Sequence, residues 1–78
     1  MHYVYMLQNE DEKLYVGYSY DLKRRLYEHQ HGEVTTTKGY ERAKLVWYCA
    51  FTGKKKALNF EKYLKEGSGH AFARKHLI

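Results

Sequence analysis

The side chains in this chain that could carry chemistry are two tyrosines, one arginine, one histidine and one glutamate. They are Tyr5, Tyr15, Arg25, His29 and Glu61, and the two tyrosines lie ten residues apart in short apolar runs. Phenols and imidazoles transfer protons, a guanidinium binds anionic oxygens, and a carboxylate can hold a hard divalent cation. Taken one at a time, the tyrosines are ordinary strand residues. The chemical interpretation therefore depends on whether the polar side chains occupy faces that burial alone would fill with apolar residues.

Two of these side chains lie on a predicted helix that follows the second tyrosine run. Ser19 or Asp21 can cap its start, and Gly32 can end it in the left-handed conformation. On a helical wheel with ~100° per residue, the leucines of this segment define one apolar stripe. His29 falls inside that stripe and Arg25 borders it. These positions allow a chemical role, but His29 could also be a packing histidine, and Arg25 could extend past the leucines to solvent.

A second helix is predicted over residues 54–65, where Ala57, Phe60 and Leu64 recur at helical spacing. Glu61 lies about 40° from Ala57 on the wheel, so its carboxylate points where the core should be. This is the second polar side chain on a face that packing would make apolar.

The tyrosines themselves are predicted to lie on a β-hairpin. Residues 2–8 and 13–18 are rich in Tyr, Val and Leu, and the segment between them is polar. Tyr5 and Tyr15 project to the same side of this hairpin only if the connecting loop holds an odd number of residues.

The remaining segments complete a small α+β fold. Residues 33–43 read as a polar loop that carries Lys38 and Arg42, and the apolar run 45–51 is predicted to be a central strand. A short terminal helix is expected over residues 71–77 after a glycine-rich break. The predicted order is ββαβαα, a three-stranded antiparallel sheet flanked by helices.

Composition narrows the classes of function. A chain of 78 residues holds one modest core, and 14 Lys and Arg against 9 Asp and Glu give a net charge of +5. This charge favours a polyanionic partner, nucleic acid before an anionic membrane. No apolar stretch approaches the ~20 residues of a membrane-spanning helix, and no signal-peptide layout is present, so a cytoplasmic protein without a membrane partner is expected. Cys49 is the single cysteine, which excludes an intramolecular disulfide and a cysteine-ligated zinc site.

The ordered set of segments resembles the GIY-YIG nuclease superfamily, most closely its small stand-alone members. Tyr3-Val4-Tyr5 stands for the first signature, Tyr15-Val16-Gly17 for the second, Asp21 to Leu26 with His29 for the helix, and Glu61 to Lys65 for the acidic element. The resemblance covers almost the whole chain and implies a single nuclease domain over residues 1–78. It departs from the family pattern at two places: Tyr3 replaces the first glycine, and the loop from Glu33 to Arg42 lacks a histidine that some members carry.

This resemblance implies hydrolysis of a phosphodiester bond with one divalent metal ion, Mg²⁺ or Mn²⁺, bound by Glu61. A hard ion of this kind needs only one or two carboxylates when phosphate oxygens supply further ligands. Arg25 would hold the non-bridging phosphate oxygens. Further contacts to the substrate are expected from Lys38, Arg42, Lys62 and Lys65.

The resemblance also suggests Tyr5 as the base that activates water, although an ordinary phenol has a pKa near ~10 and would need cationic neighbours. His29 is the alternative base, or the group that takes the proton of Tyr5. Tyr15 would donate a hydrogen bond to phosphate or position the water. Gly17 would let the backbone approach the substrate closely.

The leading interpretation is an endonuclease that nicks DNA, in repair or recombination. The alternatives are a nucleic-acid-binding module with little or no catalysis and a protein-interaction scaffold with a basic face. Glu61 could instead be half of a structural ion pair with a lysine or with Arg25, and Lys62 and Lys65 could belong to a solvated helix face. The choice between DNA and RNA, the oligomeric state and a protein partner that supplies specificity stay open.

Overall fold

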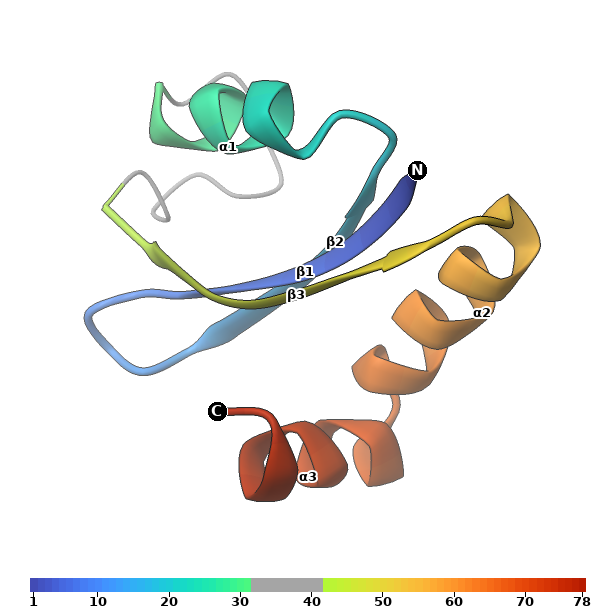
Figure 1. Cartoon of the computed structure of the whole chain (residues 1–78). Helices are drawn as coiled ribbons and strands as arrows, with labels where there is room; N and C mark the ends of the chain where they lie inside the picture. The colour runs from blue at the N-terminus through green and yellow to red at the C-terminus, as the bar shows by residue number, and fades with distance from the viewer. Residues whose placement is uncertain (32–41) are drawn as a thin grey trace.

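The computed structural model describes residues 1–31 and 42–78, and the predicted site residue Lys38 lies outside them. The elements are β1 (His2–Gln8), β2 (Leu14–Ser19), α1 (Leu22–Gln30), β3 (Lys44–Phe51), α2 (Lys54–Lys65) and α3 (Gly67–His76). In the described part of the chain the strands form one antiparallel sheet in the order β2-β1-β3. The predicted α+β class and the order ββαβαα are confirmed (Figure 1).

The hairpin places both tyrosines on one face. The connection between β1 and β2 holds five residues, an odd number, and the register pairs Tyr5 with Gly17 and Leu7 with Tyr15. Because side chains alternate between the faces of a strand, Tyr5 and Tyr15 project to the same side. The Asn9 side chain accepts hydrogen bonds from two amides of the connection at 3.0 and 2.9 Å, which holds the loop in this register.

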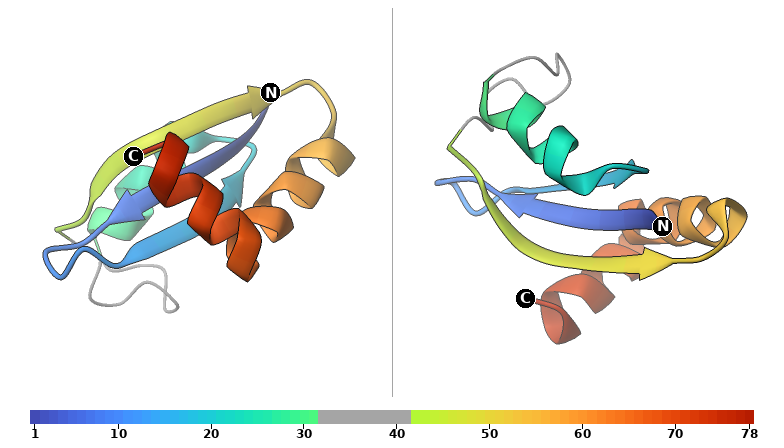
Figure 2. Two further views of the ribbon diagram at one scale, coloured as in Figure 1. Left: turned by 90° about the horizontal axis from the view of Figure 1, so that it is seen from below. Right: turned by 45° about the horizontal axis from the view of Figure 1, so that its top comes forward.

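Helices cover both faces of the sheet. Figure 1 shows α1 on one side and α3 on the other, and Figure 2 shows α2 along the end of the strands. The face toward α2 and α3 carries the core of aliphatic side chains, Val4, Met6, Val16, Ala57, Leu64 and Ala73. The alternate residues of β1, among them Tyr5, therefore face α1. None of the described helices is long and apolar enough to cross a membrane.

The prediction that residues 45–51 form a central strand is wrong. The central strand is β1, and β3 pairs with it along one edge only. The run is nevertheless apolar because one face of β3 contributes Trp47 and Cys49 to the periphery of the core. On its other face Leu45 is 37% and Tyr48 56% exposed. The hydrophobicity of this run therefore did not mean that the strand is buried on both faces.

The helix α1 begins at one of the two predicted capping residues. Asp21 is the N-cap, and its side chain accepts a hydrogen bond from the Arg24 amide at 3.1 Å. Ser19 accepts from the Asp21 amide at 3.0 Å and so supports the cap rather than making it. The helix ends at Gln30, and Gly32 lies outside the described residues.

The last helix begins earlier than expected, at Gly67 rather than at residue 71. A Cβ on Gly69 would collide with the carbonyl oxygen of Tyr63, so this buried glycine lets the start of α3 lie directly against the end of α2. Close packing has outweighed the low helix propensity of glycine here.

Candidate active site

Three of the predicted side chains meet between the sheet and α1. Tyr5 from β1 and His29 from α1 share a hydrogen bond of 2.6 Å between Oη and Nε2. Their ring centroids lie 5.6 Å apart, and the Tyr15 ring of β2 lies 6.3 Å from Tyr5 and 5.3 Å from His29. Three elements that are separate in the sequence thus build one polar aromatic cluster.

The inner members of this cluster are removed from solvent. Tyr5 is 0% and His29 1% exposed, whereas Tyr15 is half-buried. The prediction that His29 lies in the apolar stripe of its helix is therefore confirmed. Its hydrogen bond to Tyr5 distinguishes it from a histidine that only fills space.

The Tyr5 phenol lies directly over Gly17. A Cβ built on Gly17 would stand 2.5 Å from both Cζ and Oη of Tyr5. The glycine is thus required by the packing of the phenol, a reason that the sequence did not reveal. Its close approach to a substrate stays a prediction.

Burial holds the pKa of the Tyr5 phenol above its ordinary value of 10, and the neighbouring Tyr15 raises this pKa further. The charge of Arg25 and a side-chain hydrogen bond with it lower the pKa, while the Glu61 carboxylate raises it. The phenol is therefore protonated at neutral pH. These influences also place Arg25 and Glu61 in the electrostatic surroundings of Tyr5.

Burial lowers the pKa of His29 below its ordinary value of 6.5, the nearby Arg25 lowers it further, and Glu28 acts in the opposite direction. The imidazole is therefore neutral at neutral pH. With the proton of the neutral imidazole on Nδ1, the Tyr5 hydroxyl donates and His29 Nε2 accepts, and with the proton on Nε2 the direction is reversed.

Arg25 lies at the border of the cluster. Its side chain is 41% exposed, and its Nη1 is 3.5 Å from Oε1 of Glu28. Arg24 contacts the other oxygen of Glu28 at 3.7 Å but is 77% exposed. Arg25 therefore combines influence on the buried phenol with access to solvent, the position that a phosphate-binding arginine requires.

Glu61 is mostly covered, with 19% of its side chain exposed, and its Oε2 accepts from Lys65 Nζ at 3.3 Å. The ion pair that the sequence left open is thus present, with a lysine one turn along α2. Among the described residues no group of three or more His, Cys, Asp and Glu side chains could hold a metal ion. A single partly exposed carboxylate fits a Mg²⁺ or Mn²⁺ ion that takes its other ligands from water and phosphate.

The predicted substrate-contacting residues are dispersed. Lys65 is drawn to Glu61, and Lys62 is exposed on the same helix. Arg42 lies beside Gln8 and Asn9 at the hairpin end of the sheet, where these residues line a small cavity.

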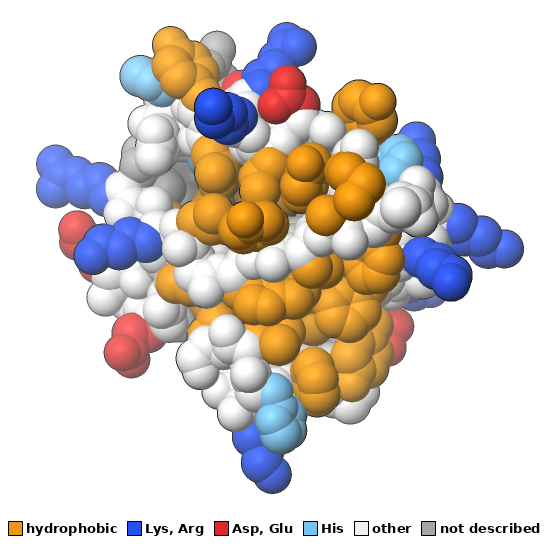
Figure 3. All heavy atoms as spheres, viewed as in Figure 1, with side chains coloured by type: hydrophobic (Ala, Val, Ile, Leu, Met, Phe, Trp, Pro, Cys, Tyr) orange, Lys and Arg blue, Asp and Glu red, His pale blue; other side chains and the backbone are white. Residues whose placement is uncertain are grey.

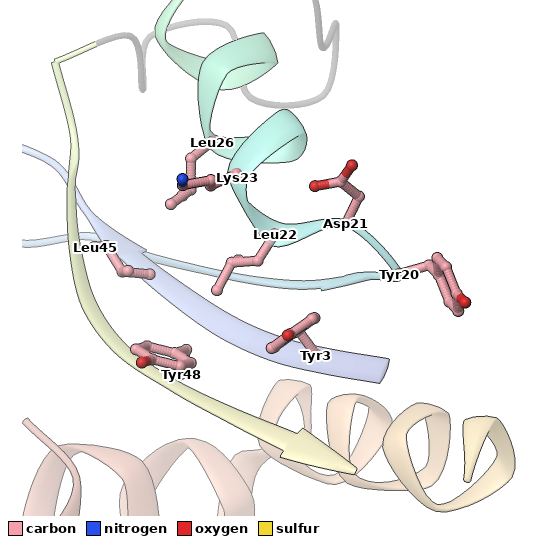
Figure 4. Close-up of a pocket in the computed structure, with 8 residues that line it drawn as sticks. All are labelled: Tyr3, Tyr20, Asp21, Leu22, Lys23, Leu26, Leu45 and Tyr48. Atoms are coloured by element: carbon pink, nitrogen blue, oxygen red, sulfur yellow. The ribbon is translucent and has the colours of Figure 1, made fainter. Parts of the chain in front are cut away.

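The sequence did not reveal a second hollow on the same face of the sheet. This α1–β3 groove has a volume of about 510 Å³ and is lined by Tyr3, Tyr20, Asp21, Leu22, Lys23, Leu26, Leu45 and Tyr48 (Figure 4). The sequence contains one indication of this groove: Tyr3 lies two residues before Tyr5 and therefore projects from the same face of the strand. The contribution of β3 could not be read from the sequence, since its place at the sheet edge was unknown.

The GIY-YIG catalytic domain model matches residues 1–75 of this chain. A UPF0213 protein of Haloquadratum walsbyi is 40% identical over 65 residues, which cover 82% of this chain and 73% of that protein. A UPF0213 protein of Clostridium perfringens is 37% identical over 67 residues, covering 85% and 72%. The solution NMR structure of a UPF0213 protein from Bacillus halodurans is similar with a TM-score of 0.61 at 30% identity, over 97% of this chain and 85% of that chain. The chain thus belongs to the GIY-YIG catalytic domain family, and its relatives are small UPF0213 proteins.

Proposed function

We propose that this domain is a divalent-metal-dependent endonuclease that hydrolyses one phosphodiester bond of DNA at a time. The observation that carries the proposal is the buried 2.6 Å hydrogen bond between Tyr5 and His29, with the charges of Arg25 and Glu61 both acting on the same phenol. A histidine that merely packs would not need a tyrosine flanked by a guanidinium and a carboxylate. Membership in a catalytic-domain family supports nuclease chemistry as the class of reaction.

The Tyr5–His29 pair supplies a path for one proton. As water attacks phosphorus, its proton passes to Tyr5 Oη while the phenolic proton passes to His29 Nε2. Tyr5 ends as a neutral phenol and His29 as an imidazolium, so no phenolate has to accumulate at neutral pH. The relay uses the Nδ1–H tautomer of His29, and the raised pKa of the phenol and the lowered pKa of the imidazole make both groups neutral before the reaction.

Arg25 binds the non-bridging oxygens of the phosphate and offsets the charge that grows as the new P–O bond forms and the bond to O3′ breaks. Glu61 is the residue that would hold the metal. The ion, when bound, supplies Lewis-acid stabilisation of the phosphate and the leaving oxygen. The Oε2 atom of this carboxylate also lies 3.3 Å from Lys65 Nζ.

One observation favours a second candidate, a nucleic-acid-binding domain without turnover. Tyr5 and His29 are 0% and 1% exposed, so hydrolysis requires that substrate binding bring water to the phenol beside the half-buried Tyr15. A domain that never opens this path would bind DNA through its basic surface and leave it intact.

The test is a nicking assay on supercoiled plasmid with Mg²⁺ or Mn²⁺. We expect nicked circles with the unaltered chain, none with chelator, and a loss of about 100-fold or more for Tyr5→Phe, Arg25→Ala and Glu61→Ala. Each variant has a matched control on the described surface: Tyr27→Phe, Arg24→Ala and Glu10→Ala should nick as the unaltered chain does.

Thermal melts of all variants separate loss of chemistry from loss of folding. Nicking that survives both chelation and Glu61→Ala would contradict the metal role. Salt-sensitive binding of the plasmid without any nicking would leave the binding domain as the function.

A further inference from the structure

The α1–β3 groove has no part in the proposed hydrolysis, yet it is the larger of the two hollows described above. Six of the eight residues that line it are aromatic or aliphatic, and two of its three tyrosines are far from buried: Tyr20 is 69% and Tyr48 56% exposed. Figure 3 shows hydrophobic side chains gathered over α1 and β3. A volume of about 510 Å³ lies within the ~300–1,000 Å³ of common ligand sites.

The register explains why this hollow is open. Tyr5 has Gly17 as its partner on β2 and Tyr48 as its partner on β3. The phenol leans over the glycine, toward β2, because only a residue without a Cβ leaves room for it. The phenol therefore leaves Tyr48, the partner of Tyr5 on β3, uncovered, and Tyr48 forms the floor of the groove. Tyr3 extends this floor along β1, on the same face as Tyr5.

Helix α1 separates the groove from the Arg25 side of the cluster. Leu22, Lys23 and Leu26 line the groove, whereas Arg25 lies on the other flank of the helix, about 60° before Leu22 on the wheel. Tyr20 and Asp21, which directly precede α1, line the groove as well. A polymer held at Arg25 therefore reaches the groove by crossing the first turn of the helix.

We propose that the α1–β3 groove binds unpaired bases of the DNA strand that the candidate active site cleaves. This inference rests on the proposed function, because it takes DNA as the substrate. Exposed tyrosine rings are surfaces on which single-stranded bases stack, and stacking accepts any base. The Lys23 ammonium at the rim complements the phosphates of the same strand, and the net charge of +5 has the matching sign.

The charges of Asp21 and Lys23 favour bases, rather than phosphates, in the interior of the groove. Asp21 lines the groove as well, and its carboxylate already accepts the Arg24 amide as the cap of α1. A phosphate against this carboxylate would be repelled, whereas a flat uncharged base is not. Phosphates thus belong at Lys23 and bases between Tyr3 and Tyr48.

The experiment measures fluorescence anisotropy of labelled oligo-dT and of a duplex of equal length, with chelator present so that nothing is cleaved. We expect Tyr48→Ala to weaken binding of oligo-dT by about 5- to 150-fold and to change duplex binding far less. Tyr48→Phe keeps the ring and should retain the affinity. Tyr27→Ala removes a tyrosine that is also 57% exposed on α1 but lies outside the groove, and should have no effect.

A second arm replaces bases of the oligonucleotide with abasic sites. The abasic strand should bind the unaltered chain as weakly as oligo-dT binds Tyr48→Ala, and that variant should no longer distinguish the two strands. Tyr3→Ala is made in parallel, and a thermal melt verifies that each variant is folded.

Three results would overturn the inference: equal affinity of the unaltered chain for abasic and normal strands, equal weakening of single and double strands by Tyr48→Ala, or a dimer in sedimentation that Tyr48→Ala dissociates. The last result would assign the groove to a second copy of the chain. Failure of the nuclease proposal looks different, since nicking would be absent while base-dependent binding remained.

Discussion

His29 is the residue whose environment makes the sharpest prediction about pH. It is buried against Tyr5 and Tyr15, burial lowers its pKa below 6.5, Arg25 lowers this pKa further and Glu28 raises it. In the unfolded chain the imidazole titrates at its ordinary value, so below pH 6.5 the unfolded state binds more protons than the folded state. The contribution of His29 to stability is therefore complete above pH 6.5 and is lost as the pH falls through the pKa of the folded state.

We expect the free energy of unfolding to fall from pH 7.5 to pH 5.5 by up to about 1.4 kcal/mol per pH unit from this group. Urea melts at each pH measure it, and His29→Gln should show a flatter dependence, because the other histidines are common to both proteins. Identical pH dependence in the two proteins would contradict a buried neutral imidazole. Nicking should decline over the same range, since a protonated His29 cannot accept the proton of Tyr5.

At the scale of the elements, the pairing of β1 with β2 depends on the close contact between Gly17 and the Tyr5 ring. Gly17 lies opposite Tyr5, and a Cβ there would stand 2.5 Å from the end of the phenol. Gly17→Ala should therefore destabilise the fold by about 1–3 kcal/mol, the usual cost of overpacking, and displace the hydroxyl from His29. Gly67→Ala is the matched control, because nothing lies within 4 Å of its added Cβ.

A double-mutant cycle distinguishes this contact from a general effect on the strand. If the phenol is the obstacle, Gly17→Ala should cost little in a Tyr5→Leu background, which leaves a coupling energy of about 0.5–3 kcal/mol in chemical denaturation. Additive costs would show that β2 requires glycine for another reason.

The whole molecule carries a net charge of +5, and its binding to DNA should weaken linearly in a plot of log K against log salt. Lys62 is exposed on α2, the helix of Glu61. If it contacts a phosphate, Lys62→Ala should reduce the slope for a single strand by about 0.7. Lys13→Ala, an exposed lysine in the hairpin connection, serves as control. An unchanged slope for Lys62→Ala would assign this lysine to a solvated helix face.

Local patterns determined much of this protein. The alternation of apolar residues and a cap at Ser19 or Asp21 were sufficient for the element order, whereas the shared face of Tyr5 and Tyr15 depended on the length of the hairpin loop, which only the structure fixed at five residues. Helical periodicity placed His29 in an apolar stripe, and the structure buries it. These features depend on neighbours within a few turns or one hairpin, so they can be read from the chain.

The tertiary structure decided which strand is central, where α3 begins and what each polar side chain contacts. The apolar run of β3 lies at the sheet edge, and Gly69 continues a helix that its propensity would break, because packing against Tyr63 requires it. The hydrogen bond from Tyr5 to His29 and the groove floored by Tyr48 join residues far apart in the sequence. No local pattern records such contacts, since they depend on the order of the strands and on the side of the sheet that each helix covers.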